Sequence, residues 1–277
     1  MKNLGSSSKS KINPKSVVKN NNKYVQSRLQ FNSNKTSRKS NLTKCEKCGM
    51  LYSINSIPDI DSHKTYHTMH LSGHKWAKTW GSYIEGPKLI DQKITPPTSS
   101  STSNDSTYTS DLQSKNEYVV VVRPQFPKEV KAASELMSVV NDELNAPHNE
   151  NDFWATVDGK GKLFLYIKDD RAVGAISVEP IDSTRSRWMV YENKSIIDHI
   201  RPHFKVGISR IWVCKEHRSQ GIAVKLLEAA RTNMNPSRTM QRWELAWSQP
   251  TESGGKLASK YNGMKHKSGK LLIPCYI

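Results

Sequence analysis

The sequence predicts an α+β fold for the C-terminal part of the chain, preceded by a small metal-binding module and a polar tail. In residues 207–230 an alternating apolar run, a turn with a glycine and an amphipathic stretch follow one another. Further apolar runs of strand length lie on both sides of this unit. Residues 1–44, in contrast, are Ser, Asn and Lys with few apolar side chains. We therefore expect one folded domain of about 160 residues at the C-terminal end.

The tail, residues 1–44, contains eleven Lys or Arg and neither Asp nor Glu, in a chain of 277 residues with a formal net charge of +17. It cannot bury enough apolar surface to offset its ordering entropy, so we predict a disordered basic tail. Such tails serve nuclear import or loose contact with nucleic acid, which favours a protein of the nucleus close to chromatin or DNA. Because the sequence has no long apolar run, we expect no membrane span and no secretory signal.

One apolar patch interrupts the tail, at Gln26, Leu29 and Phe31. A Gln followed by an aliphatic residue three positions later and then by an aromatic residue resembles the peptide box that docks on the replication sliding clamp. The match is degenerate, because Phe31 lies one position early and has no aromatic neighbour. The alternative interpretation is a chance apolar trio in a polar tail.

A zinc finger is predicted from Cys45, Cys48, His63 and His67. Thiolates and imidazoles are the ligands of tetrahedral Zn²⁺, and the i, i+4 spacing puts both His on one face of a helix. His70 and His74 follow closely, which leaves the second His ligand open. A single finger covers about 3 base pairs, so a structural or protein-docking role stands beside DNA recognition. We expect the finger core to consist of Met50, Leu51, Tyr52, Ile57 and Ile60.

After the finger, Trp76 and Trp80 form an aromatic segment that we expect to pack on it. Residues 95–114 are Ser, Thr, Asn and Pro without aliphatic periodicity, which is typical of a linker. The predicted organisation is a tail at residues 1–44, a zinc finger at 45–81, a linker at 82–116 and the α+β domain at 117–277.

Within the α+β domain, runs of apolar and β-branched residues predict a strand at 118–122, a helix at 128–144 and a hairpin at 161–167 and 171–178. Further strands are expected at 188–191, 243–247 and 270–277, with a short helix at 254–261. Cys214 and Cys275 are interpreted as small buried apolar residues. Glu228 lies in the polar arc of the helix after residue 221, so we expect it to be solvated.

The turn of residues 218–223, Arg-Ser-Gln-Gly-Ile-Ala, lies between the central strand and its helix. The unpaired N–H groups of a first helical turn and the helix dipole favour an anion there. Gly221 lets the backbone come close to a phosphate. A pyrophosphate is the ligand we expect, and an ordinary strand–helix turn is the alternative. Arg218 adds positive charge, unless it is a plain surface arginine.

In this context the turn resembles the cofactor turn of the GNAT acetyltransferases, which hold the pyrophosphate of acetyl-CoA. Residues 45–81, 207–223 and 246–263, with WSQPT and GGKLASKYNG, resemble the cohesin acetyltransferases, and the tail fits fungal members. The resemblance implies a GNAT fold after the finger. It also implies acetyl transfer from acetyl-CoA to lysines of the SMC-type ATPase subunit of cohesin during DNA replication, establishing sister-chromatid cohesion.

The resemblance also implies site residues. Backbone of Ile211, Trp212 and Val213 would contact the thioester and pantetheine. The pyrophosphate would lie on Ser219, Gln220, Gly221, Ile222, Ala223 and Val224, with Thr251, Glu252 and Ser253 closing the far wall. In some relatives the residue after the Ser of WS is acidic, but here it is Gln249, which cannot accept a proton. Ser209, Ser248 with a water, or Glu252 are the alternative bases, and water alone would suffice for a desolvated lysine.

Two other function classes remain open on the sequence. One is a zinc-finger regulator that binds DNA or chromatin, with the α+β domain as an inactive scaffold, although such regulators more often carry tandem fingers. The other is a GNAT enzyme that acetylates histone tails or another acceptor.

Overall fold

The computed structural model describes residues 42–84, 116–147 and 160–277. The predicted tail up to residue 41, with the box at Gln26, Leu29 and Phe31, lies outside the described residues, as does the Ser- and Pro-rich stretch 95–114. Among the described residues no helix is both long enough and apolar enough to cross a membrane.

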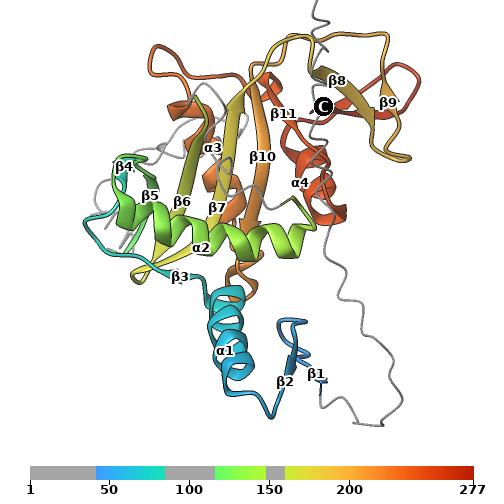
Figure 1. Ribbon diagram of the computed structural model, residues 1–277. Coiled ribbons are helices and arrows are strands. Elements are labelled where there is room, and N and C mark those ends of the chain that lie inside the picture. Colours follow the sequence, from blue (N-terminus) through green and yellow to red (C-terminus); the bar gives the residue numbers. More distant parts are fainter. Residues whose placement is uncertain (1–41, 85–115, 148–159) are drawn as a thin grey trace, which may run out of the picture. The chain divides into compact units, whose positions relative to one another are not determined.

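The N-terminal module consists of a hairpin and a helix (Figure 1). Strand β1 (Leu42–Lys44) pairs antiparallel with β2 (Leu51–Ser53), so that the last residues of the expected tail belong to the finger. Helix α1 (Ile57–Ser72) begins at Ser56, whose side chain accepts a hydrogen bond from the Asp59 N–H. It ends at Gly73, where φ is 76°. The hairpin carries Cys45 and Cys48, and the helix carries His63 and His67, as the ligand spacing predicts.

The α+β domain is built on one large sheet. Its strand order is β4 (Ser82–Ile84), β5 (Glu117–Val121), β6 (Lys162–Lys168), β7 (Arg171–Pro180), β10 (Val206–Val213), β11 (Leu245–Trp247), β13 (Leu271–Tyr276), β8 (Ser186–Val190) and β9 (Ile196–Ile197). Strand β12 (Met264–Lys265) pairs with β13, and β3 (His74–Lys75) pairs with β7. The β10–β11 and β11–β13 pairs are parallel and the remaining pairs are antiparallel.

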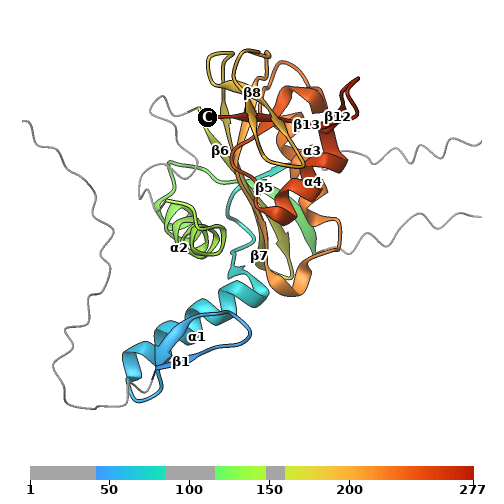
Figure 2. The same ribbon diagram turned by 90° about the vertical axis from the view of Figure 1, so that its right-hand side faces the viewer.

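Helices cover both faces of this sheet. Helix α2 (Pro127–Leu144) lies on one face, and α3 (Ile222–Asn233) and α4 (Glu252–Asn262) lie on the other (Figures 1 and 2). Short 3-10 turns at Lys215–His217 and Arg242–Glu244 precede α3 and β11. Helix α3 packs closely on β7, because a Cβ on Gly174 would lie 3.0 Å from Ile222 and 3.1 Å from Leu226. Most of the buried apolar residues therefore form one core between the sheet and its helices.

The predicted strands, helices and GNAT-type order are confirmed, with local differences. The hairpin between β6 and β7 turns through Asp169 and Asp170, whose φ angles of 49° and 57° suit a two-residue hairpin turn. The strand expected at 243–247 is wrong at its start, because residues 242–244 form a 3-10 turn in which Gln241 and the Glu244 side chain bond each other's backbone. The last helix begins at residue 252, two residues earlier than expected, since Thr251 caps it.

The expected packing of the aromatic segment on the finger is wrong. Trp76 is only 2 % exposed and belongs to the core of the α+β domain. Its backbone N–H donates to the Asp170 carbonyl over 2.8 Å, and β3 pairs with Ala172 and Arg171 beyond the end of β10. The chain that leaves the finger thus becomes part of the sheet. It continues as β4, which occupies the first residues of the expected linker.

Two further expectations about side chains have opposite outcomes. Cys214 and Cys275 are buried, as predicted. Glu228, in contrast, is not solvated. It is 5 % exposed and accepts hydrogen bonds from Arg231, Arg242 and Tyr261. Long partners from α3, the following loop and α4 reach the carboxylate, so a charged residue on the predicted polar arc is buried in an ion-pair cluster.

Candidate functional site

The central strand β10 separates from its neighbour in the middle of the sheet. Parallel pairing with β11 runs only from Val206 to Ile208, and a bulge interrupts the pairing with β7 between Ile208 and Arg210. Beyond it, residues 209–213 have no strand partner on the β11 side among the described residues. The Ser209 and Val213 carbonyls of this stretch accept hydrogen bonds from Ser248 and Arg218, and the other backbone groups that face the opening are available to an extended ligand. The predicted contact residues Ile211, Trp212 and Val213 lie on this stretch.

The turn after β10 presents the open end of α3. Ser219 and Gly221 have φ angles of 61° and 77°, and Gly221 is the helix N-cap. No side chain caps the helix, and its first turn contains no acidic residue. A Cβ on Gly221 would meet no protein atom within 4 Å, so the space in front of the turn is open. Helix α3 is twelve residues long, and its first N–H groups have no side-chain cap. Such a helix N-terminus suits a phosphate group.

Arg218 is held by the protein and does not extend freely from the turn. Its Nε donates to the Val213 carbonyl over 2.9 Å, and its guanidinium pairs with Glu143 of α2. Arg218 is therefore not a plain surface arginine, because its side chain bonds the end of β10 and α2. Sequence reasoning had no signal for Glu143, since its partners are about 70 residues away in the chain.

Residues Thr251, Glu252 and Ser253 stand at the start of α4, after β11. The Thr251 hydroxyl accepts from the Gly254 N–H over 3.2 Å. Glu252 is exposed and pairs with Lys256 over 2.7 Å, and this hydrogen bond lowers the pKa of Glu252. A carboxylate with a lowered pKa is a weak base.

The other candidate bases gather where β10 and β11 separate. The Ser248 hydroxyl donates to the Ser209 carbonyl over 3.0 Å, and Arg210 donates to the Ser209 hydroxyl over 2.7 Å. Gln249 is exposed. Tyr276, which sequence reasoning missed, reaches this place from β13: burial, and then the charge of Glu179, raise its pKa, and its hydroxyl also bonds the Ser209 side chain. A tyrosine in the last strand carries no signal of this proximity in the sequence.

The two cysteines of the α+β domain have the chemistry of buried thiols. Burial raises the pKa of Cys214 to about 11 and that of Cys275 to about 12. Both therefore stay protonated near neutral pH and are poor nucleophiles. An acyl-cysteine route has no support in this geometry.

The four predicted metal ligands lie together in the finger. Their ligand atoms are all within 4.8 Å of one another, and Cys45 Sγ is 3.3 Å from His67 Nδ1. Tetrahedral Zn²⁺ bonds of about 2.0–2.3 Å require ligand atoms roughly 3.3–3.8 Å apart, which this cluster approaches. The His63 Nε2 atom is buried without a hydrogen-bond partner. The backbone N–H of Cys48 lowers the pKa of the Cys45 thiol to about 6, which favours the thiolate that zinc binds.

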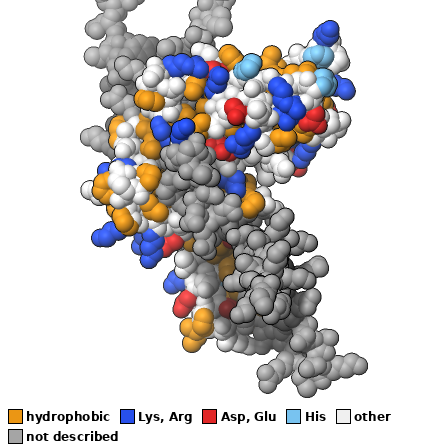
Figure 3. Space-filling model, turned by 45° about the horizontal axis from the view of Figure 1, so that its top comes forward, with side chains coloured by type: hydrophobic (Ala, Val, Ile, Leu, Met, Phe, Trp, Pro, Cys, Tyr) orange, Lys and Arg blue, Asp and Glu red, His pale blue; other side chains and the backbone are white. Residues whose placement is uncertain are grey.

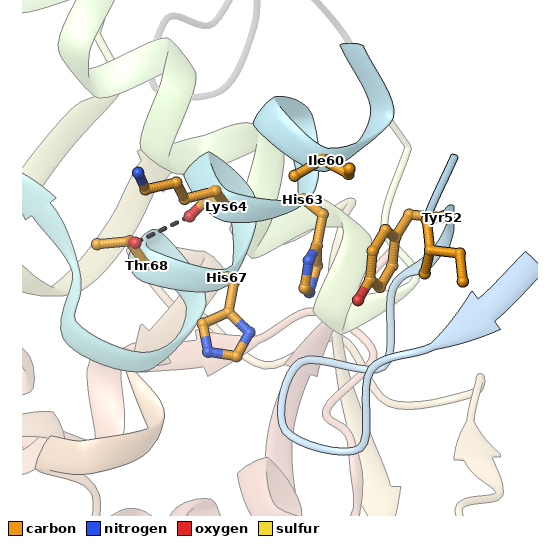
Figure 4. Close-up of a pocket in the computed structure, with 7 residues that line it drawn as sticks. Tyr52, Ile60, His63, Lys64, His67 and Thr68 are labelled. Atoms are coloured by element: carbon orange, nitrogen blue, oxygen red, sulfur yellow. Dashed lines mark hydrogen bonds between the residues drawn. The ribbon is translucent and has the colours of Figure 1, made fainter. Parts of the chain in front are cut away.

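The surroundings of the metal ligands are open on one side. The Tyr52 ring stacks on His63 with a centroid distance of 3.9 Å, and His67 lies one turn further along α1 (Figure 4). A pocket of ≈ 420 Å³ beside them is lined by Tyr52, Ile54, Ile60, His63, Lys64, His67 and Thr68. The expected apolar core of the finger is wrong in part, because Leu51, Ile57 and Ile60 are exposed. A hairpin and one helix are too small to enclose them.

The other two histidines near the finger have different partners. His70 is buried and its Nδ1 lies 3.3 Å from Glu143 Oε2. His74 contacts Glu135 over 2.9 Å. Neither belongs to the cluster of four, which settles the alternative that the sequence left open.

Known proteins resemble the chain along most of its length. A family model described as ESCO1/2 acetyl-transferase matches residues 202–271, and one described as zinc-finger of acetyl-transferase ESCO matches residues 26–69. The N-acetyltransferase ECO1 of Candida glabrata is 47% identical over 95% of this chain and 98% of its own length. The N-acetyltransferase ECO1 of Saccharomyces cerevisiae is 46% identical over 91% and 94%. A solved structure of the xEco2 acetyltransferase domain bound to a CoA conjugate is 25% identical, covers 59% of this chain and 95% of that one, and has a TM-score of 0.47.

These matches confirm the predicted zinc finger and the predicted acetyltransferase domain. The zinc-finger match includes Cys45, Cys48, His63 and His67, so the cluster is a structural zinc site. The acetyl-transferase match includes the end of β10, the turn and α3. The chain belongs to the ECO1/ESCO family of N-acetyltransferases and is an acyl-transferring enzyme.

Proposed function

We propose that this enzyme takes acetyl from acetyl-CoA and transfers it to lysines of the SMC-type ATPase subunit of cohesin, establishing sister-chromatid cohesion during DNA replication. The observation that carries the donor assignment is the open helix end at Gly221, next to the unpaired edge of β10. Ser219, Gly221 and the first turn of α3 would bind the pyrophosphate through backbone N–H groups. The edge of residues 211–213 would bind the pantetheine arm.

The chain's own groups have three tasks in this transfer. Bound acetyl-CoA supplies an activated thioester carbonyl. The β10 edge orients that carbonyl and offers an N–H donor to the oxygen on which charge develops. The lysine amine has a reference pKa near ~10.4 and must lose a proton before it attacks the thioester carbon. The C–N bond then forms, the C–S bond breaks, and coenzyme A would leave as a thiolate. A proton acceptor is therefore needed close to the opening between β10 and β11.

The best-placed groups to pass on the proton are Ser209 and Ser248 with a bound water. Gln249 cannot accept a proton, and Glu252 is tied to Lys256. The Ser248 hydroxyl donates to the Ser209 carbonyl, and the Ser209 hydroxyl accepts from Arg210. A water bound by either serine would carry the proton to solvent. A substrate lysine desolvated in the docked complex would have a lowered pKa, which reduces the demand on the base. Exchange of Ser209 for Ala should then lower kcat and change the Km for acetyl-CoA little.

A folded acceptor fits the surface better than a basic peptide. Lys and Arg side chains are spread over the face seen in Figure 3, with Asp and Glu isolated among them. A face with this balance of charge offers a basic histone tail little electrostatic attraction. On a folded ATPase head, acidic groups or DNA next to the substrate lysines would be attracted to the Lys and Arg side chains of the enzyme and would position those lysines. The basic tail supports work on chromatin, and thus in the nucleus.

The decisive experiment compares acceptors under one set of conditions. The protein is incubated with labelled acetyl-CoA and either the assembled cohesin head, a peptide containing the same lysines, or histone tails. We expect acetylation of the assembled head, weak acetylation of the isolated peptide and none of histones above background. Equal rates on peptide and head, or a preference for histone tails, would overturn the acceptor assignment while leaving the donor assignment intact.

We also propose that Gln26, Leu29 and Phe31 bind the replication sliding clamp and bring the enzyme to replication forks. The pattern of these three residues in the sequence supports this. Replacing all three by Ala should abolish clamp binding in a pull-down with purified clamp and leave acetylation of the head unchanged. Undiminished clamp binding by the triple variant would refute this role.

A further inference from the structure

Glu143, near the C-terminal end of α2, is contacted from three other elements. Trp212 of β10 donates its indole N–H to Glu143 Oε2 over 2.7 Å. Arg218, at the start of the turn, pairs with Glu143 Oε1. His70 of α1 places Nδ1 3.3 Å from Oε2. One carboxylate thus bonds the end of the central strand and the turn, and it lies beside the finger helix without a hydrogen bond to His70.

The contacts to Trp212 and Arg218 bracket the predicted acetyl-CoA site. Trp212 is 4% exposed and immediately precedes the last residue of β10, so its indole is fixed by the core. Arg218 also donates to the Val213 carbonyl, so both ends of the connection between strand and turn are held. Charge-assisted hydrogen bonds of this kind are stronger and more directional than neutral ones. They fix where the open end of α3 begins.

The third contact comes from the finger. His70 lies three residues after the zinc ligand His67 on the same helix. The finger also contacts the 3-10 turn before α3, where Lys215 donates to the Lys47 carbonyl over 2.9 Å. A second contact joins the Ser72 hydroxyl to Glu216 over 2.8 Å. The finger helix therefore packs against the same turn that Glu143 holds from α2.

We propose that Glu143 is a positioning residue that pre-organises the acetyl-CoA turn through Trp212 and Arg218. The inference rests on the proposed binding of the pyrophosphate at residues 219–224. A pre-ordered turn avoids the entropic cost of ordering its N–H groups when the cofactor binds. Glu143 also neutralises Arg218 and, together with the Val213 carbonyl, holds its guanidinium at the turn. The partners of Glu143 are Trp212, Arg218 and His70, and none of these is a group proposed to accept the proton.

The first test measures acetyl-CoA binding by calorimetry for the full chain, the Glu143→Gln variant and a matched control. Glu135→Gln is that control, because Glu135 lies on the same helix and also contacts a histidine, His74, but not the turn. We expect Glu143→Gln to weaken acetyl-CoA binding about tenfold, the loss of one charge-assisted interaction. Glu135→Gln should bind like the wild type.

A second measurement separates positioning of the turn from general damage. S-acetylpantetheine carries the thioester and the pantetheine arm but no pyrophosphate. Glu143→Gln should raise the Km for acetyl-CoA and leave both the Km for S-acetylpantetheine and the zinc content unchanged. Trp212→Phe, which removes only the indole donor, should raise the Km for acetyl-CoA about threefold, and it serves if Glu143→Gln does not fold.

The outcomes distinguish this inference from the proposed function. If the wild type does not bind acetyl-CoA, the proposed function fails. If the wild type binds and Glu143→Gln binds equally well or more tightly, Arg218 does not need this carboxylate and the inference is wrong. Equal losses with acetyl-CoA and S-acetylpantetheine would also overturn it, since they indicate damage that does not involve the pyrophosphate turn.

Discussion

The finger and the α+β domain are stabilised by different interactions. In the α+β domain, side chains such as Leu226 and Phe164 are completely buried between the sheet and its helices. In the finger, Leu51 is 63 % and Ile57 75 % exposed, and α1 buries only His70. A module of about 30 residues cannot enclose an apolar core, so the bonds to zinc replace it. The metal holds the finger, whereas burial of apolar surface holds the enzyme domain.

Removing the metal should have the largest effect. Cys45→Ser, or a chelator, should unfold the finger completely, because the free energy of zinc binding is its folding free energy. The α+β domain should keep its cooperative unfolding transition. Elemental analysis should give one zinc per chain in the wild type and in His74→Ala, and none in Cys45→Ser. A finger that stays folded without zinc would remove the contrast between the two regions.

A matched pair of apolar truncations tests the same contrast from the other side. Leu226→Ala, in α3, should lower the free energy of unfolding by about 2–5 kcal/mol, since it leaves a cavity in the core. Ile57→Ala, in α1, removes an exposed side chain and should change it by less than about 0.5 kcal/mol. Denaturant unfolding of both variants measures this. Similar losses would mean that the finger has a core of its own.

The Glu228 cluster should give the α+β domain a smaller, pH-dependent contribution. Burial raises the pKa of Glu228, but hydrogen bonds from Arg231 and Tyr261 outweigh it, so the net pKa is lowered. A lowered folded pKa means that its contribution is present above the unfolded value of 4.5 and is lost as the pH falls below it. Glu228→Gln should cost about 1–3 kcal/mol at pH 7. This deficit should shrink at pH 4, and a deficit that is independent of pH would contradict the assignment.

The sequence predicted those parts of the molecule that depend on neighbours in the chain. Ligand spacing in the finger, the Asp169–Asp170 turn and the strand–turn–helix at Gly221 are local patterns with a fixed geometry. Contacts between distant segments were not predictable in this way. Glu143 meets Trp212 across 69 residues, and His74 and Lys75 pair with a sheet strand that begins at residue 171. For the same reason the buried position of Glu228 was missed, since its partner Tyr261 lies on another helix.

The central claim is that the open end of α3 binds the pyrophosphate of acetyl-CoA, and titration calorimetry of two glycine variants tests it most directly. Gly221→Asp puts a side chain and a negative charge in front of the first-turn N–H groups. Gly269→Asp is the matched control, because Gly269 also has a positive φ of 84° and no protein atom within 4 Å of a Cβ. Both variants carry the same backbone strain and charge. We predict at least about a hundredfold loss of acetyl-CoA affinity for folded Gly221→Asp and wild-type affinity for Gly269→Asp. Equal affinity of the two variants for acetyl-CoA would contradict the account.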